Sequence, residues 1–173
     1  GMLQASERTL SAVLGRAGHN RLIRLNTGDG GPHVVIAREI QREPITGRLL
    51  HVDGHDNHAA AQAARWAREA GISVTADMDN VYPGAEELLE SVDYLLGTAE
   101  FPARLLGEED LLKGLPRFAA RYGCRIVGAT MGSRGALAWD GTRFHYSPAL
   151  RVDTVDTTGA GDIFHGGYIY GIL

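Results

Sequence analysis

The sequence predicts an α/β fold in three layers, with a mostly parallel central sheet between helices. Strand-like and helix-like segments alternate from about residue 48, and the helical segments are long enough to connect parallel strands by right-handed crossovers. A glycine-rich turn near residue 159 opens directly into an apolar helical run. With 173 residues, 44% of them hydrophobic, the chain can form one sizeable core.

Residues 1–47 differ in pattern from the remainder and are expected to be a β-rich segment. Short strands are predicted at residues 9–14 and 21–26, because a cluster of turn residues separates two runs of strand-forming residues. A glycine-rich loop precedes a third short strand at residues 33–37. Residues 48–173 are expected to form the α/β core.

The core begins with two strands and the helix that joins them. The apolar run at residues 49–53 predicts a buried strand, and Asp56 is a suitable N-cap for a helix that ends at Gly71. The β-branched residues at 72–77 predict the next strand. Both strands should therefore lie in the sheet, with their connecting helix on one face.

The middle of the chain continues the alternation. A short helix is expected at residues 84–91, a strand at 94–96 and a helix at 98–106, from apolar periodicity. Residues 108–122 are also helical in pattern, and Pro116 is expected to break or restart that helix.

The last part of the chain contains a strand, a hairpin and a helix. The apolar run at residues 124–130 predicts a strand, and Asp140-Gly141 predicts the turn of a hairpin that pairs residues 135–139 with 143–147. The helix from Ala160 onward follows the glycine-rich turn.

In open parallel sheets, ligands bind beyond the carboxyl ends of the strands. The segments that follow the predicted strands should therefore converge on one edge of the sheet. These segments are residues 53–55, 77–79, 97–100, 130–135 and 156–162.

The turn Asp156-Thr157-Thr158-Gly159-Ala160-Gly161-Asp162 is the strongest functional signal. Backbone amides and the positive end of a helix dipole converge there on one small volume, which favours an anion. Asp162 adds a carboxylate to a site that attracts negative charge, as is useful where a base must contact a hydroxyl beside a phosphate. The pattern favours phosphoryl transfer to an alcohol over the alternative of a simple helix cap.

This turn resembles the second signature of the ribokinase-like, or PfkB, carbohydrate kinase family. Thr130 to Leu137, followed by Trp139-Asp140-Gly141, is similar to that family's nucleotide-contacting strand, turn and hairpin. The resemblance implies a ribokinase-like fold, with residues 1–47 contributing a partial lid and the edge of the core. It also implies ATP-dependent phosphorylation of a sugar or sugar-like acceptor, with Mg²⁺ and, in some members, K⁺.

The resemblance assigns a role to each matching position. Asp162 corresponds to the general base, and the amides of Gly159, Ala160 and Gly161 to the anion hole for the transferring phosphoryl group. Three sets of ligand contacts are implied. Nucleotide contacts are expected at Thr130, Gly132, Ser133, Gly135 and Gly161, a water-mediated Mg²⁺ contact at Glu100, and a monovalent-cation site at Asp156 and the carbonyl of Thr158.

One position departs from the family pattern, and three alternatives stay open. The family has an Asn-x-x-Glu pattern after this strand, and this chain has Gly97 at the position of the asparagine. Glu100 matches the glutamate of the pattern, but it is equally explained as a residue in the first turn of a helix. The cluster His51, Asp53 and His55 could instead bind a transition metal, as in a metal-dependent hydrolase. A non-catalytic ligand-binding or regulatory fragment of the same fold is the third alternative.

Composition limits the partners. The net charge is −4, from 17 basic and 21 acidic residues, which does not favour nucleic acid or an anionic membrane. The single cysteine cannot form an internal disulfide, and a cytoplasmic location is expected. The partners expected are ATP and a small sugar-like molecule, and the resemblance of the early strands to lid strands allows a homodimer.

The resemblance extends over about residues 11–173. We expect the chain to be a segment of a kinase without the N- and C-terminal parts of the family, whose activity alone the sequence leaves open. The acceptor is not specified by these residues.

Overall fold

A computed structural model describes residues 47–173 of the chain. The strands expected at residues 9–14, 21–26 and 33–37 lie outside the described residues. The described elements comprise six strands, five α-helices and one short 3-10 helix. In order they are β1 (Leu49–Asp53), α3 (Asn57–Glu69), β2 (Ser73–Met78), α4 (Ala85–Leu89), β3 (Tyr94–Thr98), α5 (Phe101–Leu106), α6 (Leu111–Tyr122), β4 (Ile126–Thr130), η1 (Gly132–Arg134), β5 (Ala136–Trp139), β6 (Phe144–Ser147) and α7 (Ala160–Ile172).

The six strands form one mixed sheet in the order β1-β2-β3-β4-β5-β6. The first four strands are parallel, and helices connect them. Strands β5 and β6 are antiparallel additions at one edge, formed by the hairpin around Asp140-Gly141. The prediction of an α/β fold with a mostly parallel sheet is confirmed.

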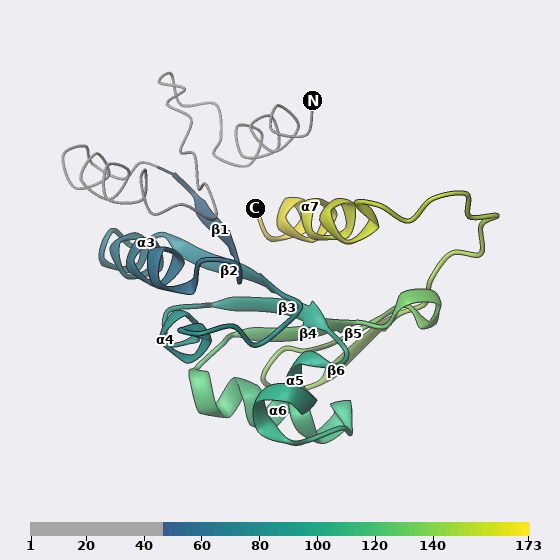
Figure 1. Cartoon of the computed structure of the whole chain (residues 1–173), viewed down its shortest axis with the longest axis horizontal. Coiled ribbons are helices and arrows are strands. Elements are labelled where there is room, and N and C mark those ends of the chain that lie inside the picture. The colour runs from purple at the N-terminus through teal and green to yellow at the C-terminus, as the bar shows by residue number, and fades with distance from the viewer. Residues whose placement is uncertain (1–46) are drawn as a thin grey trace.

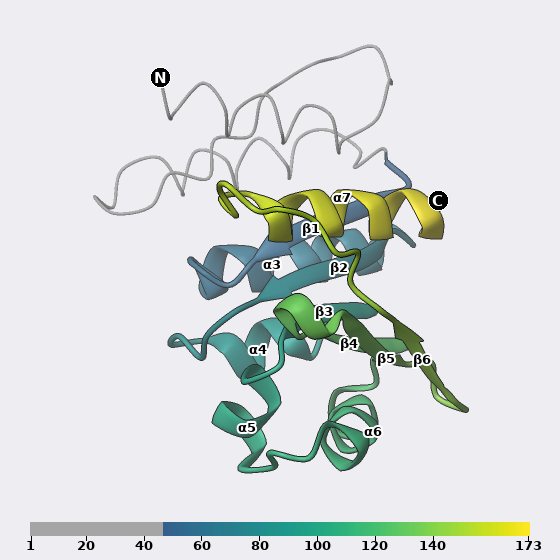
Figure 2. The same cartoon turned by 90° about the vertical axis from the view of Figure 1, so that its right-hand side faces the viewer.

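The two faces of the sheet carry different helices. Along the strands alternate side chains point to opposite faces, and one set, which includes Val52, Val74 and Val127, packs into a core with side chains from α3 to α6. Helix α7 lies on the other face, over β1 and β2 (Figures 1 and 2). Within residues 47–173, four helices therefore cover one face and one helix covers part of the other.

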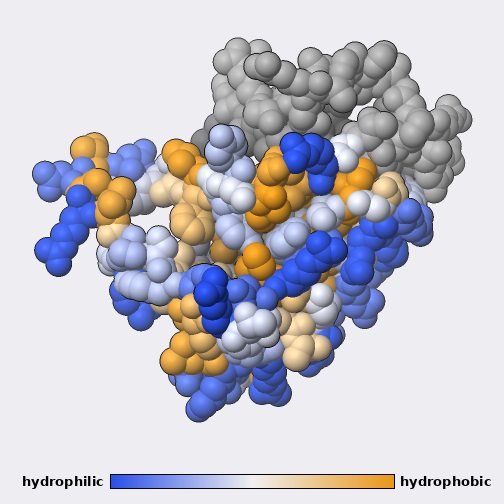
Figure 3. Space-filling view, turned by 180° about the vertical axis from the view of Figure 1, so that it is seen from behind, coloured by the Kyte–Doolittle hydropathy of each residue, from blue (hydrophilic) through white to orange (hydrophobic). Residues whose placement is uncertain are grey.

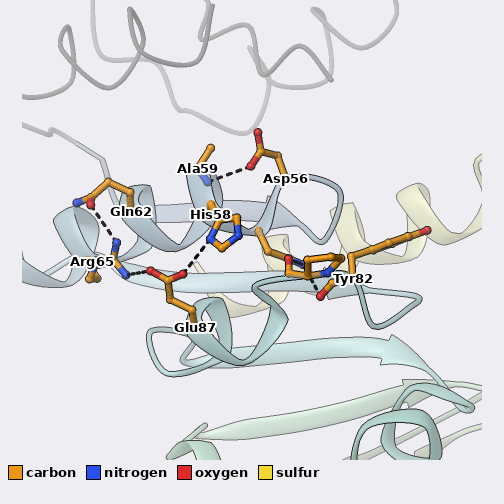
Figure 4. A network of polar contacts seen from close by, with 9 residues as sticks. Asp56, His58, Ala59, Gln62, Arg65, Tyr82 and Glu87 are labelled. Carbon is orange, nitrogen blue, oxygen red and sulfur yellow. Dashed lines mark hydrogen bonds and ion pairs between the residues drawn. The ribbon is translucent and has the colours of Figure 1, made fainter. Parts of the chain in front are cut away.

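The start of α3 confirms the predicted cap. The Asp56 side chain accepts a hydrogen bond of 3.1 Å from the backbone N–H of Ala59, which satisfies one free amide of the first turn (Figure 4). Further along α3, Arg65 donates to Glu87 of α4 at 2.8 Å, and the same carboxylate contacts His58 at 3.1 Å (Figure 4). These polar contacts join α3 to α4.

Two predicted boundaries are corrected. Helix α6 is continuous through Pro116, because its apolar face, with Leu115 and Phe118 fully buried, offsets the hydrogen bond that proline removes. The helix expected from Thr98 begins instead at Phe101, because Thr98 still pairs with Thr130 in the sheet. Helix packing decides the first of these features, and strand pairing decides the second.

Candidate functional site

The carboxyl ends of the four parallel strands meet at one edge of the sheet, called the rim below. In register, Asp53 of β1 lies opposite Asp77 of β2, and Thr98 of β3 lies opposite Thr130 of β4. Beyond the strands the backbone N–H of Ala99 donates to the carbonyl of Thr130 at 3.0 Å. The segments that follow these strands are therefore brought together, as the sequence predicts.

The N-terminus of α7 lies on the side of the rim, and the helix runs back across the sheet (Figure 2). At its far end the Arg48 side chain donates to the carbonyl of Leu173, beside the start of β1. At its near end Nε2 of His165 lies 3.1 Å from Oδ1 of Asp77. These two contacts set the direction of α7 and place the Asp162 turn beside the strand ends.

Asp162 lies in the first turn of α7 with its side chain exposed. Its carboxylate makes no hydrogen bond or ion pair with any residue from 47 to 173. Burial and the charge of His165 lower the pKa of His51, and the charge of Asp162 is one of the smaller effects that oppose this shift. An exposed carboxylate without a partner in this range is free to accept a proton or a hydrogen bond.

The amides around Gly159 are partly available. Gly159 has φ of 76°, a left-handed conformation that glycine adopts without strain, and it directs the chain into α7. The Ala160 amide donates to the carbonyl of Thr157 at 3.1 Å. The amides of Gly159 and Gly161 have no hydrogen bond to the described backbone, so both can bind an anion.

Asp156 stabilises this turn from within. Its Oδ1 accepts hydrogen bonds of 2.8 Å from both the backbone N–H and the hydroxyl of Thr158. These bonds lower the pKa of Asp156 and keep it ionised. One carboxylate oxygen is thereby used by the turn, and the second oxygen is left for a ligand.

The predicted nucleotide segment is a tight turn between β4 and β5. The Met131 amide donates to the Gly135 carbonyl at 2.8 Å, and the Thr130 hydroxyl donates to the Gly97 carbonyl at 3.3 Å. A side chain at Gly135, where φ is 88°, would collide with the backbone of Ser147. Gly132 and Ser133 are exposed on this turn. Gly135 is thus required by the fold, whether or not it contacts a nucleotide.

Glu100 and Gly97 lie at the end of β3. The Glu100 side chain is exposed and makes no hydrogen bond with any residue of the described part, so its oxygens are free to accept from a metal-bound water. A Cβ at Gly97 would lie 2.5 Å from the carbonyl oxygen of Met78. The space at Gly97 therefore has no room for the asparagine of the family pattern.

The structure does not support the alternative metal site at His51, Asp53 and His55. Within residues 47–173 no group of three or more His, Cys, Asp or Glu side chains is arranged to hold a metal ion. His51 lies beneath α7, with its ring centroid 5.7 Å from that of His165. His55 instead stacks on Tyr82 at 5.8 Å, because the strand ends at Asp53 and the chain turns away.

The polar side chains between α7 and the sheet include one that sequence reasoning missed. His165 is 5% exposed and contacts Asp77 across the interface. The available signal was an imidazole in an otherwise apolar helix, three residues after Asp162. Several polar atoms in this layer are buried without a hydrogen-bond partner among the described residues. They are Nδ1 of His51, Oγ1 of Thr75, Nδ1 of His165 and the hydroxyl of Tyr168.

Apolar surface lies close to the turn. On α7, Ile163 is 77% exposed and Tyr170 is 85% exposed. The segment between β6 and α7 projects from the body of the molecule and exposes Leu150, Val152 and Val155 (Figures 1 and 3). These side chains bury little apolar area against the described residues. In this range no helix is long and apolar enough to cross a bilayer.

Comparison with known proteins gives consistent matches. Residues 4–173 match the sequence profile of a family described as pfkB family carbohydrate kinase. The chain is 32% identical over 160 residues to an ATP-dependent ribose-1-phosphate kinase from Halopiger xanaduensis, covering 91% of this chain and 49% of the relative. It is 33% identical over 121 residues to the aminoimidazole riboside kinase of Salmonella typhimurium, covering 65% of this chain and 38% of that protein.

A solved structure shows the same fold. The crystal structure described as a putative ribokinase from Agrobacterium tumefaciens superimposes with a TM-score of 0.62 and 29% identity, covering 69% of this chain and 40% of that one. The chain spans about half or less of the length of each of these proteins.

Proposed function

Because the chain belongs to the pfkB family of carbohydrate kinases, we propose that it transfers the γ-phosphoryl group of ATP to a hydroxyl of a sugar or sugar-like acceptor. The observation that carries this proposal is the exposed Asp162 carboxylate beside the free amides of Gly159 and Gly161, at the rim of a parallel sheet. A base and an anion site in one turn are what phosphoryl transfer to an alcohol requires.

Asp162 and the amides of residues 159–161 have different roles in the proposed reaction. The Asp162 carboxylate takes the proton of the acceptor hydroxyl as that oxygen attacks the γ-phosphorus. The bond from phosphorus to the oxygen of the β-phosphate breaks, and ADP leaves. The amides of Gly159, Ala160 and Gly161 would stabilise the charge on the transferring group, once the Ala160 amide turns from the Thr157 carbonyl or shares its hydrogen bond.

The nucleotide and ions have candidate ligands at the same edge. Thr130, Gly132, Ser133 and Gly135 would contact the nucleotide, together with Gly161. The carboxylate of Glu100, which has no partner among the described residues, could bind Mg²⁺ through a water molecule. For K⁺, the Thr158 carbonyl and one oxygen of Asp156 are available, because Oδ1 of Asp156 already accepts two hydrogen bonds from Thr158. When bound, Mg²⁺ would neutralise charge on the phosphates.

Ribose-containing molecules are the first acceptors to examine. Two of the relatives are named for ribose 1-phosphate and for a riboside, which are both ribosyl compounds. Fructose and other sugars are named in further relatives, for example a fructokinase of Klebsiella pneumoniae. We therefore place ribosides and sugar phosphates ahead of free hexoses.

The experiment that tests this proposal measures ADP formation with ATP, Mg²⁺ and a panel of ribosides, pentoses and hexoses. Asp162→Asn should lower kcat about a hundredfold or more, because a positioned base contributes at least that factor. ATP affinity should stay within about twofold, because the change removes no nucleotide contact. Asp153→Asn, an exposed aspartate between β6 and α7, is the matched control and should keep full activity.

Two results would count against the proposal. If Asp162→Asn keeps wild-type turnover, Asp162 is not the base. If the unmodified chain binds ATP and turns over no acceptor, the non-catalytic alternative is favoured. The fact that the chain spans about half the length of its relatives is the observation behind that alternative.

A further inference from the structure

Few side chains hold α7 on the sheet. In the described part of the chain, its buried residues are His165 and Ile169, both 5% exposed. The residues of the first turn are exposed, so His165 is the buried residue nearest to Asp162. The one basic side chain of α7 is His165, and its Nε2 lies 3.1 Å from Oδ1 of Asp77.

The partner of His165 lies on a rigid element. Asp77 lies in β2, whose backbone pairs with β1 on one side and β3 on the other. Its register partners are Asp53 and Leu96. A side chain fixed at the end of a central strand therefore contacts α7 one turn after Asp162.

A second imidazole, that of His51, packs against His165 beside this contact. The rings of His51 and His165 are 5.7 Å apart, and their planes are tilted by 44°. Burial, followed by the charge of His165, lowers the pKa of His51, against the opposing effect of Asp77, Asp53 and Asp162. His51 packs against His165 and makes no hydrogen bond to Asp77.

We propose that Asp77 and His165 are a positioning pair that fixes the Asp162 carboxylate at the rim. This inference rests on the proposed function, because it takes Asp162 as the base. A base acts only within hydrogen-bond reach of the hydroxyl, and a displacement of about 1 Å can lower a rate by about a hundredfold. In this proposal the pair acts through α7, by holding the helix that carries Asp162.

The test compares His165→Leu, His165→Gln and Asp77→Ala with the unmodified chain. His165→Gln keeps an N–H donor that can reach Asp77, so its kcat should stay within about threefold of that of the unmodified chain. His165→Leu has no such donor, and its kcat should be about tenfold to a hundredfold lower. KM for ATP should stay within about twofold in all three, since no nucleotide contact is removed. His58→Gln is the matched control, because its imidazole also lies 3.1 Å from a carboxylate, that of Glu87, and is exposed.

Hydrogen exchange of residues 160–165 gives a readout that needs no activity. Exchange in the first turn of α7 should be faster in His165→Leu and Asp77→Ala, and unchanged in His165→Gln and His58→Gln. If His165→Leu does not fold, Asp77→Ala and His165→Gln carry the test.

The outcomes separate the two proposals. Wild-type kcat and unchanged exchange in His165→Leu or Asp77→Ala would overturn the positioning pair, and so would a glutamine variant as impaired as the leucine variant. If the unmodified chain turns over no acceptor, the proposed function fails, and the exchange results decide whether the pair positions α7.

Discussion

Gly97 lies where β3 passes the backbone of Met78, and the space for a side chain there is already occupied. The nearest atom to a Cβ at this position would be the Met78 carbonyl oxygen, at 2.5 Å. Since that atom belongs to the backbone of a central strand, it cannot move without disturbing the pairing of β2 with β3. In this structure the position therefore has room for glycine and for no larger residue.

A stability measurement checks this steric limit. Gly97→Ala should lower the free energy of unfolding by about 1–3 kcal/mol, the usual cost of overpacking a core. Gly166→Ala on α7, where a Cβ meets nothing within 4 Å, should instead raise it by about 0.5–1 kcal/mol. Urea unfolding of both variants gives the comparison. Equal stability of Gly97→Ala and the parent would show that β3 shifts freely.

At the scale of elements, the contact between β1 and α7 should make stability depend on pH. Burial and His165 lower the pKa of His51 from its ordinary value of 6.5. Above that value, His51 is neutral in both states. As the pH falls below it, the unfolded chain binds the proton first, so the free energy of unfolding falls, by at most about 1.4 kcal/mol per pH unit.

Urea unfolding at pH 7.5 and pH 5.5 measures this loss in the parent and in His51→Gln. The parent should lose more stability than the variant between these values, because glutamine cannot be protonated. The carboxyl groups whose pKa is lowered, such as Glu87 with an ordinary value of 4.5, lose their contribution only below this range. Equal losses in parent and variant would contradict the role given to His51.

On the scale of the whole molecule, Cys124 reports on the opening of the core. Burial, with a smaller effect of Asp93, raises the pKa of this thiol to about 12. The thiolate is the reactive form, so the folded chain should react with a disulfide reagent such as DTNB far more slowly than the chain in urea. Because the sequence has one cysteine, the unfolded chain should release one equivalent of the reagent's thiolate per chain. Rapid release from the folded chain would show that the core opens near β4.

The sequence alone predicted the order of the elements from residue 48 and the turn that carries Asp162. Local signals were sufficient there. Asp56 caps α3 as its position before a helical run predicts, and Gly159 before α7 has the positive φ that glycine adopts without strain. Strand ends on one edge followed from the parallel topology, because that topology depends on the order of the elements and not on details of packing.

Only the tertiary structure decided which side chains meet. His51 and His55 appeared to belong together in the sequence, but the end of β1 directs one beneath α7 and the other towards Tyr82. Asp77 and His165 are 88 residues apart and touch, at 3.1 Å, because α7 crosses back over β2. Sequence patterns record the local preferences of the chain. Long-range contacts depend on how whole elements pack, and no local pattern contains that information.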